Sequence, residues 1–499
     1  MADTAESSTL SYEGMTFQER EEYIRVFFQR YFYFDIPRKD LDVLKLRSVE
    51  RDALAFGIPE KKAHNKVQLL LEQGFQRLKN NLTDRHATYI HHGLGIPLMG
   101  NNAFGVVDRG SNIIEIKPVT GCNLKCVFCS VKEGRDPETM GWEDYVVERS
   151  YLVQETAKIA AIKKHPVEIN IGPQGEPLLY PEMVELVRDL KGIPNVSVIS
   201  VNTNGVLLNP ALIDKLAEAG LTRINLSLHA LKQDLAQELM GAQYSLKHIL
   251  DVIEYAKTKL AVLIAPVLVP GMNEGEMKGL VELSQRVKQE STAKSQSRFP
   301  TIGIQNFLNY KHGRNVAKAK PWEEFFADLQ KLEKDTGANL LLKQGKPGAD
   351  GNPNPFSIHP EETLPKPFVK DEIIEAVVKC PGRYPGEMIA VARGRNITII
   401  AGGDSKDGKS SRDRGDGGNT SKIGSTVHLR IVRDKHNIFQ GILTKAKATK
   451  FGRDARKEYF LLQKHKKRRQ QRESSERQEE GTRKEAQQEK GKILDDDAP

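Results

Sequence analysis

The feature that most constrains the fold is a series of short apolar segments that alternate with amphipathic ones. The apolar segments lie at residues 113–117, 167–171, 196–201, 223–228, 260–269 and 302–307. Helical periodicity occurs between them, near residues 143–163, 181–191, 209–219, 231–240, 245–257 and 275–288, and again over 322–335. Parallel neighbouring strands need crossover connections, so this order predicts a parallel sheet. Right-handed crossovers would curl it, and we predict an α/β fold, a partial (β/α)6 TIM-like barrel, over residues 109–345.

The region before this core has a different pattern. Eight aromatic residues between Phe17 and Phe34 recur close to a helical period, which predicts a mostly helical N-terminal region over residues 1–108. These aromatics would pack a helix on a core or, alternatively, form a surface on which bases stack. A second helix is predicted over residues 61–82.

Three further segments follow the core. Residues 346–381 are predicted to be a Pro-rich linker, since six of the 24 prolines fall between 346 and 367. Residues 382–446 predict a small β domain with strands at 387–392, 396–401, 426–432 and 439–443, interrupted by a Gly-rich insertion over 402–424. The tail over 447–499 is charged and poor in apolar residues, which favours disorder, with a solvated helix as the alternative.

The basic charge of the chain is local. Residues 445–472 hold twelve Lys and Arg against Asp454 and Glu458, an excess larger than the formal net charge of +9 of the whole chain. Such a block favours a phosphate-rich partner, and a solvated tail is the alternative. The longest apolar stretch is far shorter than the ~20 residues that span a bilayer, and the first residues lack a secretory signal pattern. We therefore expect a cytoplasmic protein with no membrane partner.

Cysteine usage points to one metal site. Three of the four cysteines, Cys122, Cys126 and Cys129, fall within eight residues, directly after the first predicted core strand. Thiolates favour iron–sulfur clusters or zinc, but structural zinc prefers four protein ligands, and no fourth Cys or His lies near this loop. Three thiolates on a [4Fe–4S] cluster leave one iron open for another molecule. Barrel enzymes place their chemistry at this end of their strands.

This motif, Cys122-x-x-x-Cys126-x-Phe128-Cys129, resembles the signature of the radical S-adenosylmethionine (SAM) superfamily. The resemblance implies two cofactors, a [4Fe–4S] cluster held by the three cysteines and SAM bound to the open iron. It implies reductive cleavage of SAM to methionine and a 5′-deoxyadenosyl radical, which abstracts hydrogen from a substrate. The cofactors carry this chemistry, and the protein orients them.

Further motifs at strand ends agree with that family. Gly172-Pro173-Gln174-Gly175-Glu176-Pro177 resembles its GGEP motif, which holds the SAM amino group, although Gln174 departs from it; a Gly-Pro turn with a surface Glu is the alternative. Thr203 and Asn204, in Asn202-Thr203-Asn204-Gly205, resemble its T-N-G turn, and Ser227 is placed for a ribose or carboxylate contact. Alternation puts Asn225, Ser227 and His229 on one face, so His229 would contact substrate or be structural. The turn containing Val269 and Gly271 is similar to the segment that supports adenine.

The small β domain has its own resemblance. Residues 384–400 and 422–431 resemble a TRAM domain, an OB-type module of RNA-modifying proteins, and such barrels bind single strands through basic grooves. The groove candidates are Arg393, Arg395, Arg430, Arg433, Lys435 and His436. A small barrel with ordinary surface charges is the alternative. The layout is similar to tRNA methylthiotransferases, but residues 1–121 contain no cysteine, so the chain resembles more the little-characterised archaeal-type radical SAM proteins with a C-terminal TRAM module.

Cys380 stands apart, before Pro381. It is a candidate catalytic thiol, and a buried structural cysteine is the alternative. The sequence as a whole predicts a radical SAM enzyme that modifies RNA, with tRNA favoured, and that takes electrons from a separate donor. The alternatives are a radical SAM enzyme for a protein, lipid or small molecule, and an RNA-binding protein with a structural cluster.

Overall fold

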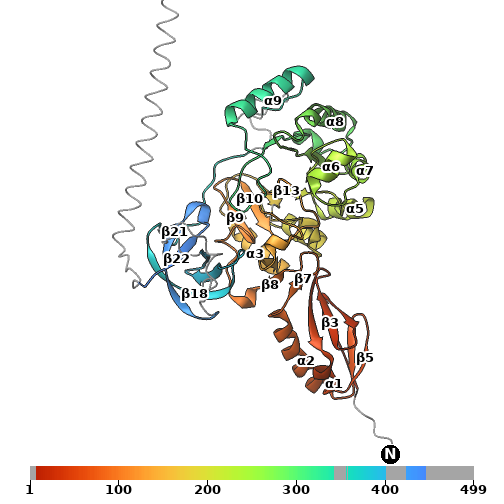
Figure 1. The fold of residues 1–499 in the computed structure, drawn as a ribbon, viewed down its shortest axis with the longest axis vertical. Coiled ribbons are helices and arrows are strands. Elements are labelled where there is room, and N and C mark those ends of the chain that lie inside the picture. Colours follow the sequence, from red (N-terminus) through yellow and green to blue (C-terminus); the bar gives the residue numbers. More distant parts are fainter. Residues whose placement is uncertain (1–6, 173, 342–355, 357, 401–422, 446–499) are drawn as a thin grey trace, which may run out of the picture.

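The computed structural model describes residues 7–172, 174–341, 356, 358–400 and 423–445. Three parts follow one another along the chain: an N-terminal β-rich part, an α/β core and a C-terminal β-barrel (Figure 1). Most of the expected insertion over 402–424 and the whole tail over 447–499 lie outside the described residues. Within the described residues, no helix combines the length and apolar character that crossing a bilayer requires.

The N-terminal part consists mainly of strands, so the prediction of a mostly helical region was wrong. One sheet has the order β11-β8-β7-β4-β3-β2, and a second has the order β1-β6-β5. The strands are β1 (Ser8–Ser11), β2 (Met15–Glu19), β3 (Tyr23–Phe28), β4 (Phe32–Pro37), β5 (Leu46–Val49), β6 (Ala53–Phe56), β7 (Lys79–Asn80), β8 (His86–Ile90) and β11 (Glu143–Val147). The described helices are the short α1 (Arg38–Asp42) and α2 (Glu60–Phe75), so the expected second helix forms but ends at Phe75.

The aromatic run forms the hairpin of β3 and β4 rather than a helix. Burial alternates residue by residue in both strands, the two-residue period of a sheet. Gln29 and Arg30 turn the chain with positive φ angles of 45° and 64°. Hairpin turns with positive φ usually contain Gly or Asn, and this turn contains neither. The sequence therefore gives no sign of a hairpin turn here.

The core sheet follows the predicted alternation closely. Its order is β15-β14-β13-β12-β10-β9, and all neighbours are parallel except β9 and β10. The strands are β9 (Gly105–Asp108), β10 (Ile113–Lys117), β12 (Val167–Ile171), β13 (Val196–Thr203), β14 (Arg223–Leu226) and β15 (Ala261–Ile264). The sixth predicted strand is short: β17 (Gln305–Asn306) pairs with β16 (Val267–Leu268) in a separate parallel pair. The α/β class is confirmed, with five of the predicted strands in one sheet.

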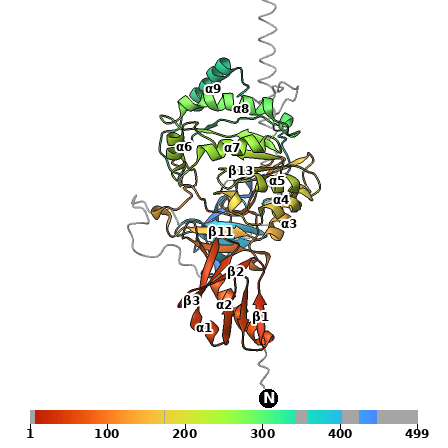
Figure 2. The same ribbon diagram turned by 90° about the vertical axis from the view of Figure 1, so that its right-hand side faces the viewer.

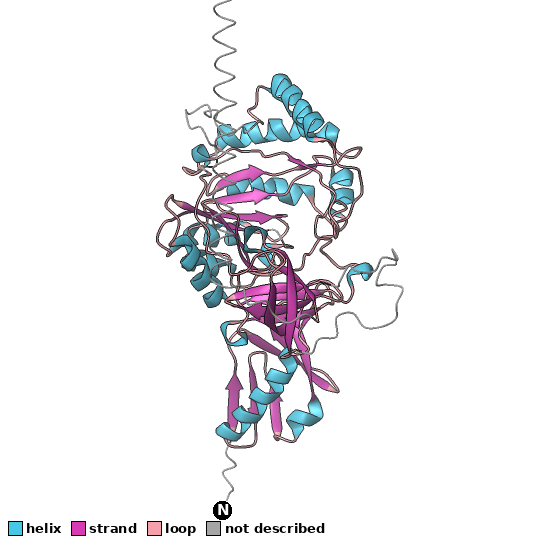
Figure 3. Ribbon diagram, turned by 90° about the vertical axis from the view of Figure 1, so that its left-hand side faces the viewer, coloured by secondary structure: helices cyan, strands magenta, loops and turns pink. Residues whose placement is uncertain are grey.

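Helices connect these strands and cover the outer side of the curved sheet (Figures 2 and 3). They are α3 (Arg149–Ala160), α4 (Met183–Lys191), α5 (Pro210–Ala219), α6 (Gln233–Met240), α7 (Leu246–Ala256) and α8 (Met277–Glu290). A further helix, α9 (Trp322–Thr336), follows β17 and packs against α8. Local chemistry sets their ends: Asn209 Oδ1 accepts from the N–H of Leu212 at 3.0 Å to cap α5, Pro210 opens it, and Gly220 ends it at φ 107°. Residues 143–147, expected to begin a helix, form β11 instead.

The C-terminal domain is a closed five-stranded barrel of order β18-β19-β20-β22-β21. Its strands are β18 (Ile373–Pro381), β19 (Met388–Ala392), β20 (Arg395–Ile399), β21 (Thr426–Arg433) and β22 (Gln440–Leu443), around a core of its own. The four predicted strands are confirmed. The predicted linker boundary at 381 was wrong, because residues 373–381 are the first strand and alternate between buried and more exposed side chains.

Candidate functional site

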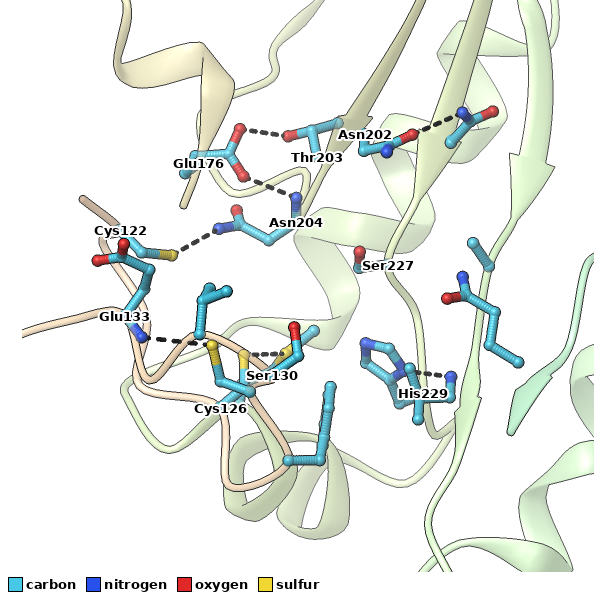
Figure 4. Close-up of a pocket in the computed structure, with 18 of the residues that line it drawn as sticks. Cys122, Cys126, Ser130, Glu133, Glu176, Asn202, Thr203, Asn204, Ser227 and His229 are labelled. Atoms are coloured by element: carbon cyan, nitrogen blue, oxygen red, sulfur yellow. Dashed lines mark hydrogen bonds between the residues drawn. The ribbon is translucent and has the colours of Figure 1, made fainter. Parts of the chain in front are cut away.

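A cavity of about 360 Å³ opens where the core strands β12, β13 and β14 end (Figure 4). The carboxyl ends of parallel strands meet at one edge of a sheet, so the turns after them converge there. The cysteine loop after β10 forms one wall, the turns after β12 to β14 form a second, and β16 and β17 form a third. Cys122, Cys126 and Cys129 all line this cavity.

Backbone hydrogen bonds fasten the cysteine loop to the end of α6. The N–H of Lys125 donates to the carbonyl of Met240 at 3.1 Å, and that of Val127 to the carbonyl of Leu239 at 3.0 Å. Gly241, at φ 60°, follows α6, and a Cβ there would stand 2.0 Å from the Lys125 carbonyl oxygen. Only glycine therefore permits this approach.

Arg314 holds the same loop from the other side. Its Nη1 donates to the carbonyls of Cys126 at 3.2 Å and Glu133 at 2.9 Å, while its Nη2 donates to Asp136 Oδ2 at 2.9 Å. Its backbone N–H donates to the Cys129 carbonyl at 2.8 Å. Arg314 lies 188 positions from Cys126 and belongs to no motif, so its role could not be predicted from the sequence.

The three thiols suit a metal cluster. The backbone N–H groups of Leu124 and Glu133 donate to the Sγ atoms of Cys122 at 3.4 Å and Cys129 at 3.3 Å. Burial raises the pKa of Cys126 to about 12 and also raises the pKa values of Cys122 and Cys129, so ionisation needs a compensating cation such as iron. Among the described residues, no three His, Cys, Asp or Glu side chains converge on a single metal ion. A multi-iron cluster needs no such convergence, because its thiolates bind different irons.

Glu176 joins two turns beside the cysteine loop. Its Oε1 accepts from Thr203 Oγ1 at 2.7 Å and from the N–H of Leu178 at 3.0 Å, and its Oε2 accepts from the N–H of Asn204 at 2.8 Å. Burial raises the pKa of this carboxyl to about 7, against the lowering by its three donors. Asn204 in turn donates through Nδ2 to Asn123 Oδ1 at 2.8 Å, so these turns and the cysteine loop form one hydrogen-bonded unit.

Comparison with known proteins agrees with this geometry. The model of the radical SAM superfamily matches residues 116–284, which include the cysteine loop and the strand-end turns. The chain belongs to the radical SAM superfamily. It is 37% identical over 376 residues to "Uncharacterized protein MJ0103" of Methanocaldococcus jannaschii, covering 72% of this chain and 81% of that protein.

Other similarities of this radical SAM enzyme are confined to part of the chain. It is 33% identical over 176 residues to GTP 3′,8-cyclase of Lactiplantibacillus plantarum, covering 34% of this chain and 49% of the cyclase, so it spans about half the length of that relative. Similar solved structures include TYW1 with a lysine-pyruvate adduct bound (20% identity, TM-score 0.32, 48% of this chain and 78% of that chain). Methylornithine synthase is another (18% identity, TM-score 0.33, 44% and 62%).

The cofactors of this radical SAM enzyme are a [4Fe–4S] cluster and SAM, which together supply a carbon-centred radical. The predicted site residues that line the cavity are Cys122, Cys126, Phe128, Cys129, Gly175, Glu176, Thr203, Asn204 and Ser227. The cysteines would hold the cluster, and Gly175, Thr203, Asn204 and Ser227, which line the same cavity, would orient SAM. The cavity also contains Asn225 and His229, as the predicted alternation requires.

Four predicted residues do not line the cavity. Pro177 is buried directly after Glu176 in the chain, and Val269 is buried two residues after Val267, which lines the cavity instead. Gly271 is exposed, and its N–H donates to Glu274 Oε1 at 2.7 Å. Cys380 is buried in β18, and burial raises its pKa. The structure therefore supports the alternative that Cys380 is a buried structural cysteine.

Neutral polar groups form the wall opposite the cysteines. Asn225 Nδ2 donates to Asn202 Oδ1 at 2.7 Å, and Arg223 Nε fixes Asn225 by donating to its Oδ1 at 2.8 Å. Gln305 and Asn306 add further neutral polar groups from the adjoining wall that β17 forms. Gln305 and Asn306 were not among the predicted site residues, although their position at the end of a predicted strand was a usable signal. Among the described residues that line the cavity, none is Lys or Arg.

His229 also lines the cavity, and one of its ring nitrogens is held by a backbone hydrogen bond. Its Nδ1 accepts from the N–H of Val267 at 3.0 Å, so the neutral ring carries its proton on Nε2, which points into the cavity (Figure 4). Burial lowers the pKa of His229 to about 3, so the ring is neutral at pH 7. Its ring meets that of Phe128 edge-on, with centroids 4.5 Å apart. His229 therefore presents an uncharged donor to whatever occupies the cavity.

Proposed function

We propose that this radical SAM enzyme modifies RNA, with tRNA as the favoured substrate, through a 5′-deoxyadenosyl radical that abstracts hydrogen from the nucleotide. The observation that carries the RNA assignment is the closed C-terminal barrel beside a radical SAM core. Its order, with the parallel pair β20 and β22, supports an OB-type module such as a TRAM domain. OB-type barrels bind single-stranded nucleic acid through cationic grooves.

The cations of the barrel suggest which side the RNA would approach. Arg433 and Lys435 are exposed, and Arg430 lies at the surface 3.6 Å from the exposed Asp371. Arg393 and Arg395, also groove candidates, are instead tied to carbonyl groups of the preceding segment, those of Pro367 and Pro365. The proposed groove therefore runs along β21 and the turn that follows it, which contains the half-buried His436.

The chemistry of the cavity supports a nucleobase as the reacting group. Asn202, Asn225, Gln305 and the Nε2–H of His229 offer neutral donors and acceptors. Such groups recognise the edges of bases by hydrogen bonds. Phosphates and carboxylates prefer Arg and Lys, which are not among the described residues of the cavity wall.

A small-molecule substrate is the second candidate, and the similarity to GTP 3′,8-cyclases favours it. The described residues of the cavity wall include no Lys or Arg, which weighs against a triphosphate with its several negative charges. Protein or lipid substrates, and an RNA-binding protein with a structural cluster, remain as alternatives. The cytoplasmic location and the separate electron donor stay predictions.

The test is 5′-deoxyadenosine release by the anaerobically reconstituted enzyme, with SAM and reductant, in the presence of tRNA, GTP or neither. We expect tRNA to stimulate release, and the variant Arg430→Gln/Arg433→Gln to need more tRNA for half-maximal stimulation. Lys247→Gln, on the exposed face of α7, is the matched control and should behave as wild type. Stimulation by GTP alone would favour the small-molecule candidate, and no release in any tube would favour the structural-cluster alternative.

A further inference from the structure

We propose that Arg383 of the C-terminal barrel is a positioning residue that sets the reduction potential of the cluster, by neutralising Glu133 beside Cys129. The proposal goes beyond the RNA assignment and does not depend on it. It concerns a cluster of four charged side chains, Arg85, Glu133, Asp144 and Arg383, which we call the buried charge cluster.

All four side chains are inaccessible to water, with at most 4% of each exposed. Arg85 Nη1 lies 2.9 Å from Glu133 Oε2 and 3.4 Å from Asp144 Oδ1. Arg383 Nη1 lies 2.5 Å from Asp144 Oδ1, and its Nη2 contacts Glu133 Oε1. Each arginine therefore bridges both carboxylates.

Each of the three parts of the protein contributes at least one side chain to the buried charge cluster. Arg85 lies between β7 and β8, Glu133 follows the cysteine loop, Asp144 lies on β11, and Arg383 follows β18. Arg383 also donates to the carbonyl of Glu143, and Tyr145 Oη donates to the carbonyl of Pro381 at 3.0 Å, so the start of the barrel is docked on β11. The C-terminal barrel thus supplies one of the four charges.

The charges balance only as a set of four. Two arginines and two carboxylates sum to zero, and a buried charge is tolerated when it is paired and hydrogen-bonded. Loss of the Arg383 charge leaves a net charge of −1 in a buried region. Loss of the Glu133 charge leaves +1 in the same place.

Glu133 links the buried charge cluster to the cysteines that would hold the iron–sulfur cluster. Its backbone N–H donates to Cys129 Sγ at 3.3 Å, and Glu133 itself lines the cavity that the three cysteines share. Net charge and hydrogen bonds to sulfur are two established determinants of iron–sulfur potentials. Since reduction adds an electron to the cluster, an uncompensated Glu133 opposes reduction, and an uncompensated arginine favours it.

The barrel makes a second contact around the same loop. The Tyr384 ring stacks on His312 with centroids 3.7 Å apart and meets Trp142 edge-on at 4.7 Å. His312 precedes Arg314, whose hydrogen bonds hold the cysteine loop. The segment 383–384 therefore contacts the cysteine loop region twice: Arg383 pairs with Glu133, and Tyr384 stacks on His312.

The experiment is a redox titration of the reconstituted holoenzyme, followed by the electron paramagnetic resonance of the reduced cluster. Its variants are Arg383→Gln, Glu133→Gln and the double variant. Arg393→Gln is the matched control, because this barrel arginine pairs with the buried Glu372 and not with the buried charge cluster. Iron and sulfide content is measured for each protein first.

We expect Arg383→Gln to shift the potential to more negative values by at least tenfold in the ratio of reduced to oxidised cluster, which is about 59 mV for one electron. Glu133→Gln should shift it in the opposite direction, the double variant should return toward wild type, and Arg393→Gln should leave it unchanged. Shifts of the same sign in both single variants, or no recovery in the double variant, would overturn the proposal.

Should Arg383→Gln fail to hold a cluster, Glu133→Gln and the double variant still decide the matter. Glu133→Gln keeps the backbone hydrogen bond to Cys129, so a potential equal to that of wild type would overturn the proposal. The readout needs no substrate. A result against the RNA assignment therefore leaves this inference standing, and the reverse also holds.

Discussion

Gly175 lies so close to Gly121 that a Cβ on Gly175 would stand 1.9 Å from the Gly121 carbonyl oxygen. The next residue confirms the contact, since the N–H of Glu176 donates to the same carbonyl at 2.9 Å. The turn after β12 is therefore fastened directly to the residue before Cys122. This contact joins two neighbouring walls of the cavity, the turn after β12 and the cysteine loop.

Gly175→Ala should disrupt that contact. Its φ of 111° already disfavours a side chain, and the new Cβ would meet backbone rather than a movable side chain. We expect a loss of stability above about 2 kcal/mol and weakened SAM binding. Gly337→Ala, at φ 68° with nothing within 4 Å, is the control and should cost about 1 kcal/mol. Equal melting temperatures for the two variants would contradict the contact.

Cys126→Ala and Cys380→Ala should separate the cluster from the lone thiol. Cys126→Ala should retain the fold, lose most of its iron and abolish SAM cleavage. Cys380→Ala should keep wild-type iron content and SAM cleavage while losing about 1–2 kcal/mol of stability, because it leaves a small space in the core. Iron analysis and 5′-deoxyadenosine release decide both. Loss of cleavage in a folded, iron-replete Cys380→Ala protein would restore the catalytic hypothesis.

The pKa of His229 predicts a pH dependence of stability. Burial lowers the pKa to about 3 from an ordinary value of 6.5, so below pH 6.5 the unfolded chain binds a proton that the folded protein does not. Stability should therefore fall as the pH drops below 6.5, by about 1.4 kcal/mol per pH unit. His229→Asn removes this effect. The difference in melting temperature between wild type and variant should shrink from pH 7.5 to 5.5. A constant difference would contradict the lowered pKa of His229.

Arg314→Lys should loosen the cysteine loop. A lysine cannot reach the carbonyls of Cys126 and Glu133 and the carboxylate of Asp136 together, as the guanidinium does. We expect the free energy of unfolding to fall by about 2 kcal/mol and a chelator to remove iron faster. Arg188→Lys, on the exposed side of α4, is the control. Iron removal at the same rate in both variants would show that Arg314 does not hold the loop.

Much of the site follows from the sequence because its chemistry lies in short local motifs. The cysteine motif, the turn at Glu176, the turn at Thr203 and the alternation from Asn225 to His229 each follow a core strand that the sequence predicts. Parallel strands bring their carboxyl ends to one edge, so locating the strands was enough to gather these motifs. The turn at Val269 does not follow this rule, because β15 ends at Ile264 and the next residues pair with β17 as β16, which places Val267 rather than Val269 at the cavity.

The N-terminal part shows where local pattern is insufficient. The residues between Phe17 and Phe34 suit a helix or a hairpin, and the choice depends on strand partners as distant as Lys79 and Asn80. Propensity is a weak guide where pairing across the sheet supplies the packing.

By itself, the sequence determined the α/β core, the cysteine loop, the strand-end turns and four strands of the C-terminal domain, because periodicity and motif are local properties of the chain. Only the tertiary structure decided the N-terminal sheets, the first barrel strand and the buried charge cluster. Glu133 and Arg383 are 250 residues apart, and each alone has the sequence signal of an ordinary surface charge. Their burial and pairing come from the docking of the barrel on the core, and that docking is a property of the whole folded chain.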